Sequence, residues 1–203
     1  MLTIAGRKRD EIYFRIPNQV VREQIYGYLN QTYRDNELDI NDYRRNKLMG
    51  DMAYDGDWRS FFDFIAETLR RFASNRDKAK GEAFVHGFTL AQTCLGKFYM
   101  PVSELDAGAK VTIGDTTVGG YADIYLQPLL NIYPDIEHSY VLELKYLPAL
   151  ATDAEVTAAA AQAREQLLRY AKSVAVESTY SPTRLHRLVL LWRGMELAVA
   201  EEL

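Results

Sequence analysis

One short apolar run, residues 139–146, restricts the fold of this chain more than any other part of its sequence. The even-numbered side chains of the run are large and apolar, and they share one face of a predicted strand: Tyr140, Leu142, Leu144 and Tyr146. The opposite face carries Val141, Glu143 and Lys145. Charged groups are costly to bury within a hydrophobic sheet, so Glu143 and Lys145 call for a partner or a chemical role.

A second acidic residue lies in a neighbouring predicted strand. Residues 119–128 read as a strand, and Asp123 within it would bring another carboxylate beside Glu143. Two carboxylates that share a divalent cation lower the cost of their burial, and oxygen ligands of this kind suit Mg²⁺ or Mn²⁺. Such an ion lowers the pKa of bound water, while Lys145 orients or deprotonates that water and stabilises the developing negative charge. The residues therefore predict phosphodiester hydrolysis.

The first eighty residues are predicted to be helical after a short strand or extended arm over residues 1–16. Helical spacing begins at residue 18 and recurs over residues 36–50, with Asn36 as the expected cap. It recurs again after Asp57, the expected cap of a third helix. The polar stretch 74–81 is the predicted boundary between a helical N-terminal subdomain, residues 1–80, and a core of residues 81–203.

Helical and strand patterns are mixed beyond that boundary. A helix is expected over residues 82–98 and a long one from about 153 to 176. Strands are expected at 99–102, 119–128 and 139–146, with a hairpin over 110–118, and residues 184–192 contain the last apolar run. This order predicts an α/β fold with a central mixed sheet flanked by helices.

Composition narrows the class of protein. No stretch approaches the roughly 20 apolar residues that a membrane helix needs, and the N-terminal residues lack a signal-peptide pattern, so we expect a cytoplasmic protein. The single cysteine, Cys94, excludes a thiolate zinc cluster. The net charge of −4 requires any phosphate-binding surface to be local. Basic residues are in excess between 164 and 193, and Arg44, Arg45 and Lys47 form a second cluster; a solvated helix face is the alternative explanation for both.

The candidate residues also occur in a recognisable order. Gly120-x-x-Asp123, then Glu143-Leu144-Lys145, then Gln166-x-x-x-Tyr170 resembles the PD-(D/E)XK nuclease superfamily, which implies a restriction-endonuclease-like core. More narrowly, about residues 80–195 resemble the nuclease-like domain found at the C-terminus of bacterial AAA-ATPase-like proteins. The segments GEAFVHGFTLAQTCLGKF, GGYADIYLQP, SYVLELKYLP and AREQLLRYA carry this likeness.

The resemblance implies roles for individual residues. Asp123 and Glu143 would bind Mg²⁺ or Mn²⁺, with the Leu144 carbonyl as a further ligand, and Lys145 would be the catalytic lysine. Glu82 matches an acidic residue that serves as an additional ligand or positions water, and His86 is a weaker candidate for that role. Gln166 and Tyr170, four residues apart on one helix face, would lie near the active site and the substrate backbone.

The sequence departs from the resembling proteins in three respects. The resembling proteins commonly have Gly-Arg-x-Asp, and here Tyr121 replaces the Arg of that pattern. The segment between Asp123 and Glu143 is long, and the sequence contains no Gly-x-x-x-x-Gly-Lys-Ser/Thr phosphate loop.

Each candidate also has a plainer explanation. Glu143 and Lys145 would also be expected as an ordinary ion pair on a solvated edge strand. Asp123 could stabilise a turn, and Glu82 could simply interact with the positive end of a helix dipole. His86 would suit a packed helix position, and the pair Gln166 and Tyr170 an ordinary helix face.

Three functions remain open at this point. The leading hypothesis is a metal-dependent nuclease acting on nucleic acid, with DNA as the first expectation and an AAA-type ATPase as a partner. The alternatives are a catalytically silent nuclease-fold module that serves such an ATPase, and a protein that binds nucleic acid without hydrolysing it.

Overall fold

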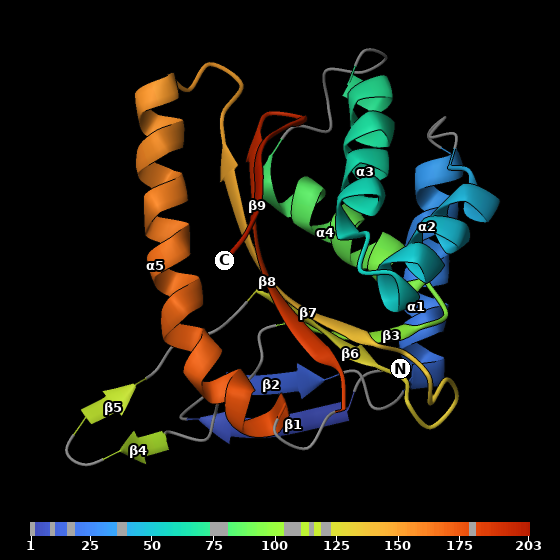
Figure 1. Ribbon diagram of the computed structural model, residues 1–203. Coiled ribbons are helices and arrows are strands. Elements are labelled where there is room, and N and C mark those ends of the chain that lie inside the picture. The colour runs from blue at the N-terminus through green and yellow to red at the C-terminus, as the bar shows by residue number, and fades with distance from the viewer. Residues whose placement is uncertain are drawn as a thin grey trace.

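A five-stranded mixed sheet forms the centre of the computed structural model, with helices on both of its faces (Figure 1). The strands lie in the order β3 (Tyr99–Ser103), β6 (Ile124–Pro128), β7 (His138–Leu147), β8 (Arg184–Arg193) and β9 (Glu196–Glu202). Strands β7 and β8 are parallel, and the other neighbouring pairs are antiparallel. The predicted α/β class with a central mixed sheet is therefore confirmed.

The structure describes residues 3–8, 11–15, 19–35, 40–73, 81–103, 111–113, 116–118, 123–178 and 182–203. Within these ranges, only the backbone is described for residues 3–8, 11–15, 19, 22, 72–73, 102–103, 111–113, 116–118 and 169–178. In the described part of the chain, no helix has both the length and the apolar character that crossing a membrane requires.

The helices divide unequally between the two faces. On one face are α1 (Gln19–Asp35), α2 (Asp42–Tyr54), α3 (Trp58–Ala73) and α4 (Glu82–Cys94), while α5 (Asp153–Ser178) lies on the other (Figure 1). The larger core packs Phe61 and Phe88 against Leu142 and Trp192, so it draws on both sides of residue 80. The smaller core lies beneath α5 and includes Val141 and Leu167. The alternation predicted for residues 139–146 thus separates two cores. The proposed division into two domains remains a prediction.

Buried hydrogen bonds also join the helices to the sheet. The Tyr140 hydroxyl, on β7, donates to the backbone oxygen of Met52, on α2, at 2.7 Å. Both groups are out of contact with water, so each would lose a partner if the other were removed. This bond fixes the helical layer to the central strand.

The helix starts were predicted with mixed success. The prediction of Asp57 as a cap is confirmed, because its Oδ1 accepts from the Ser60 N–H at 3.2 Å, just ahead of α3. Asn36 lies outside the described residues. Helix α2 begins later than predicted and is capped by Asn41, whose Oδ1 accepts from the Arg44 N–H at 2.9 Å. Two asparagines precede the same apolar stripe, and sequence alone did not distinguish them.

Two hairpins lie outside the main sheet. The prediction of a hairpin over residues 110–118 is confirmed by β4 (Val111–Ile113) and β5 (Thr116–Val118). The expectation that residues 1–16 form a single strand or arm was wrong, because β1 (Thr3–Lys8) pairs with β2 (Glu11–Arg15). The residues between the two strands, Arg9 and Asp10, lack the Gly that marks most two-residue hairpin turns, so the sequence contains no clear turn signal.

Strand β9 was not predicted. It follows a turn at Gly194, whose φ of +60° suits glycine, and it returns antiparallel along β8 as the edge of the sheet. Its sequence alternates only weakly in hydrophobicity because neither face of this edge strand is fully buried. The Arg-Gly-Met turn after an apolar strand was the available signal.

Candidate active site

The candidate site is built on the face of β7 that α5 covers. On this face Val141 packs with Tyr125 of β6, Val189 of β8, and Ala163 and Leu167 of α5. Glu143 is the next side chain along the same face and is only 1% exposed. A carboxylate thus lies between the sheet and a helix in surroundings that are otherwise largely apolar.

Glu143 is incompletely partnered for so deeply buried a group. Its Oε1 lies 2.8 Å from Nζ of Lys145, whose side chain is 27% exposed and therefore reaches toward solvent. Its Oε2 is buried and has no hydrogen-bond partner. Burial is the main cause that raises the pKa of Glu143, the Lys145 hydrogen bond and charge lower it, and the charge of Asp123 adds to the rise. The pKa that results is about 7. An additional cation would relieve this cost.

Asp123 immediately precedes β6 and lies beside Glu143. Ile124 pairs with Leu142 in the antiparallel register, so the preceding residue falls opposite Glu143. The carboxylate Oδ2 of Asp123 accepts a hydrogen bond from the backbone N–H of Leu144 at 2.7 Å. The structure therefore brings Asp123, Glu143 and Lys145 together at the middle of the sheet, with the Leu144 backbone between them.

Helix α5 brings Gln166 to the same side of the sheet. Arg164 makes two bonds to Glu201, with Nε–Oε1 at 2.6 Å and Nη2–Oε2 at 2.8 Å. Gln166 lies two residues further, about 200° around the helix from Arg164. Its Oε1 is buried and unpartnered. Tyr170 belongs to α5, but its side chain lies outside the described residues.

The residues of α4 belong to the opposite face. Val85 and Phe88 bury this helix in the larger core, whereas Glu82 is exposed at its first position. His86 is half-buried, and its Nε2 has no partner. Among the described residues, no three His, Cys, Asp or Glu side chains converge closely enough to hold a metal ion. Glu82 therefore does not join Asp123 and Glu143 as a third carboxylate in this arrangement.

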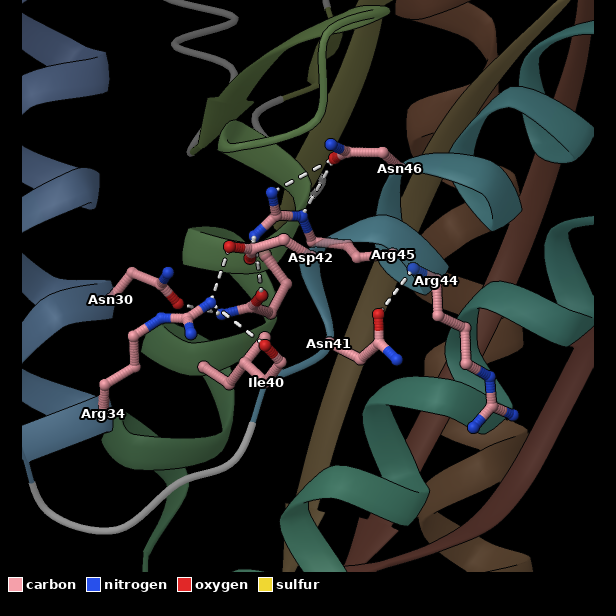
Figure 2. Close-up of polar contacts among 9 residues, drawn as sticks. Asn30, Arg34, Ile40, Asn41, Asp42, Arg44, Arg45 and Asn46 are labelled. Atoms are coloured by element: carbon pink, nitrogen blue, oxygen red, sulfur yellow. Dashed lines mark hydrogen bonds and ion pairs between the residues drawn. The ribbon is translucent and has the colours of Figure 1, made fainter.

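Each basic residue of the cluster on α2 pairs with a carboxylate, and Figure 2 shows one of these contacts, between Arg45 and Asp42. Arg44 pairs with Glu67 at 2.8 Å, and Lys47 pairs with Asp51 at 2.6 Å. Arg45 is buried and turned inward to Asp42 at 2.8 Å. Arg44 and Lys47 are exposed, as the alternative of a solvated helix face expects, whereas Arg45 is buried.

The Asp123–Glu143 pair offers only oxygen donors, which is the donor set that Mg²⁺ and Mn²⁺ prefer. A bound cation would offset both the lack of a partner at Glu143 Oε2 and the raised pKa of that carboxyl. The donor set of these two residues therefore fits a divalent ion, and the Leu144 carbonyl or solvent would supply further ligands.

Comparison with known proteins gives one match. A family model described as the PD-(D/E)XK nuclease superfamily matches residues 81–202, which is more than half of the chain and includes Asp123, Glu143, Lys145 and Gln166. No curated protein and no solved structure gave a significant match.

Proposed function

The chain belongs to the PD-(D/E)XK nuclease superfamily, and on that premise we propose that it hydrolyses phosphodiester bonds of nucleic acid with a divalent metal ion at Asp123 and Glu143. One observation carries the proposal: Glu143 is buried, one of its oxygens lacks a partner, and it lies beside Asp123 and Lys145. A structural ion pair would have needed only Glu143 and Lys145. The second carboxylate is explained by a shared cation.

The residues divide the work of hydrolysis. A Mg²⁺ or Mn²⁺ ion would supply charge neutralisation at a phosphoryl oxygen and a more acidic water. Asp123 is oriented by the Leu144 N–H, so its carboxylate is fixed before substrate arrives. Lys145 is held by Glu143 Oε1 and partly exposed, so its ammonium can orient the attacking water and stabilise negative charge on the phosphate. The bond from phosphorus to the water oxygen forms as the bond to the leaving oxygen breaks, and that oxygen takes up a proton.

We further propose roles for the remaining candidates. Gln166, with its buried and unpartnered Oε1, would hold a water or a substrate group beside the carboxylates. Tyr170 follows one turn later in the same helix. Glu82 lies on the helix that packs against the opposite face, so it would position water only if binding of substrate or metal brings it toward the carboxylates.

Activity assays on the purified chain test the proposal. Linear, circular and single-stranded DNA and RNA would be incubated with Mg²⁺, Mn²⁺ or EDTA. The wild type is compared with Asp123→Asn, Glu143→Gln and Lys145→Ala. Lys47→Ala is the matched control because Lys47 also pairs with an acid, but on α2. We expect metal-dependent cleavage that the three site variants lose and the control retains.

Other outcomes would identify the alternatives. Equal cleavage by Asp123→Asn and Lys145→Ala would remove those residues from the mechanism. Absence of both cleavage and calorimetric metal binding would favour the silent module. Salt-dependent binding without product under any metal would favour a nucleic-acid-binding protein.

DNA as substrate, a cytoplasmic location and an AAA-type ATPase partner complete the proposal. The substrate and the partner are supported by the resemblance to the nuclease-like domain of bacterial AAA-ATPase-like proteins, and the location is supported by the sequence pattern alone. Co-purification of an ATPase with the tagged chain from its own cells, with ATP-dependent stimulation of cleavage, would support the partnership.

A further inference from the structure

Three polar atoms between the sheet and α5 are buried without a partner. They are the acceptors Glu143 Oε2 and Gln166 Oε1 and the donor Arg187 Nε. A buried polar group without a partner is destabilising, and a native structure has a reason for each such group. The other such atoms in the described part of the chain belong to the opposite layer or the larger core: His86 Nε2, Thr89 Oγ1 and Trp192 Nε1.

Arg187 shares the sheet face of Glu143. The parallel register of β7 and β8 pairs Val141 with Arg187 and Glu143 with Val189. Side chains alternate along each strand, and Val141 and Val189 both lie beneath α5, so Arg187 projects to that side too. Adjacent strands and a two-residue step separate the Cα atoms of Arg187 and Glu143 by about 8 Å. An arginine side chain spans most of that distance.

Helix α5 crosses the sheet at the same level. Arg164 of α5 is bound to Glu201 of β9, Glu201 pairs with Val189, and Val189 pairs with Glu143. Gln166 lies about 3 Å beyond Arg164 along the helix axis, and its side chain faces away from Glu201. The residues of the three unpartnered atoms therefore all border the layer between the sheet and α5.

Charge distinguishes Arg187 from the other basic residues nearby. Arg164 is neutralised by Glu201, Arg193 by Asp153, and Lys145 by Glu143. Within the part of the chain that the structure describes, Arg187 pairs with no carboxylate. A phosphodiester is an anion and must approach the carboxylates of Asp123 and Glu143, so a positive charge at this place would offset their repulsion.

We propose that Arg187 binds the two non-bridging oxygens of the substrate phosphate, one through its Nε and the other through a terminal nitrogen. The guanidinium fork matches two phosphate oxygens and gains from charge-assisted hydrogen bonds. This role rests on the proposed nuclease function and assigns it a substrate-binding residue. Sequence reasoning had counted Arg187 only as one member of a basic run.

The test measures binding separately from cleavage. The full chain carrying Arg187→Gln is compared with wild type and with Arg184→Gln, an exposed arginine on the same strand but on the other face. A short fluorescent DNA duplex is titrated in EDTA at several salt concentrations, and KM and kcat are measured with Mg²⁺. For Arg187→Gln we expect about tenfold weaker binding, a salt slope lower by about one, and a raised KM. Arg184→Gln should match wild type.

The outcomes separate this inference from the proposed function. If the wild type cleaves DNA and Arg187→Gln has unchanged Kd, KM and salt slope, the proposed role of Arg187 is overturned while the nuclease function stands. Selective loss of binding in Arg187→Gln without any cleavage by wild type would support Arg187 and overturn the nuclease activity. Absence of DNA binding by wild type would overturn both.

A second variant covers a failure to fold. Circular dichroism first checks that Arg187→Gln is folded. If it is not, Arg187→Lys carries the test, because lysine keeps the charge and loses the fork. We then expect several-fold weaker binding with an unchanged salt slope. Binding equal to wild type would overturn the bidentate contact.

Discussion

Replacing Glu143 by glutamine is expected to stabilise the metal-free protein at alkaline pH. The pKa of Glu143 is raised by burial from its ordinary value of 4.5 to about 7. Between these values the unfolded chain releases the proton while the folded chain keeps it, so rising pH favours unfolding. The opposing ion pair with Lys145 is already contained in the raised value.

The size of the effect follows from the two pKa values. The difference between these pKa values corresponds to about 3 kcal/mol, most of which is lost between pH 5 and pH 8. Glutamine has nearly the same shape and does not titrate, so it should escape this loss. Relative to wild type, Glu143→Gln should therefore gain about 2–3 kcal/mol in the free energy of unfolding over that pH interval.

Urea denaturation in EDTA at pH 5 and pH 8, followed by Trp58 and Trp192 fluorescence, measures the difference. Glu196→Gln, an exposed glutamate on β9, is the control and should follow wild type. Parallel pH dependence of wild type and Glu143→Gln would refute the reasoning, as would a variant that is less stable than wild type at pH 8.

The same carboxyl links metal binding to pH. A proton on Glu143 competes with the ion, so Mg²⁺ affinity should fall up to tenfold for each pH unit below about 7. Calorimetry on wild type at pH 6 and pH 8 measures this change, and affinity that is independent of pH would contradict it. Saturating Mg²⁺ should also stabilise wild type at pH 8 but not Glu143→Gln.

Three further predictions concern a buried hydrogen bond and two helix-flanking or helical glycines. Tyr140→Phe removes the buried hydrogen bond to the Met52 oxygen and should cost about 1–2 kcal/mol in urea denaturation; an unchanged midpoint would show that the bond contributes nothing. Gly96→Ala would bring a methyl group to 1.6 Å from the Met49 sulfur and should cost about 1–3 kcal/mol, detectable as a lower Tm. Gly27→Ala meets nothing within 4 Å on helix α1 and should instead raise stability by about 0.5–1 kcal/mol.

The local sequence pattern predicted correctly those features that depend on a single strand or helix. The alternation of residues 139–146 predicted which side chains of β7 share a face, and the cores on the two sides agree with it. Asp57 predicted the start of α3 correctly because a capping side chain bonds to a backbone N–H within the first turn of its own helix. Asn41 and β9 were missed because competing caps and an edge strand leave weak local signals.

Charge counting proved less informative than pattern. The cluster of Arg44, Arg45 and Lys47 suggested a phosphate surface, but Arg44 reaches Glu67 on another helix and Arg45 turns inward. Glu82 stands at the start of α4 as expected, yet its helix packs on the face opposite Glu143. A short segment of sequence determines neither the ion-pair partner of a side chain nor the face of the sheet on which a helix packs.

The sequence by itself determined the faces of β7, the mixed α/β order and the chemical types gathered around residues 123–145, because side-chain periodicity follows from backbone geometry. Only the tertiary structure decided that Asp123 meets Glu143, that Glu143 is buried with one oxygen unpartnered, and that Arg187 lies on the same face. These facts depend on strand register and on the layer that covers the sheet. Strand register and the covering layer are both set by contacts between residues far apart in the chain. The covering layer buries Glu143, which raises its pKa, and it leaves the polar atoms beneath α5 without partners.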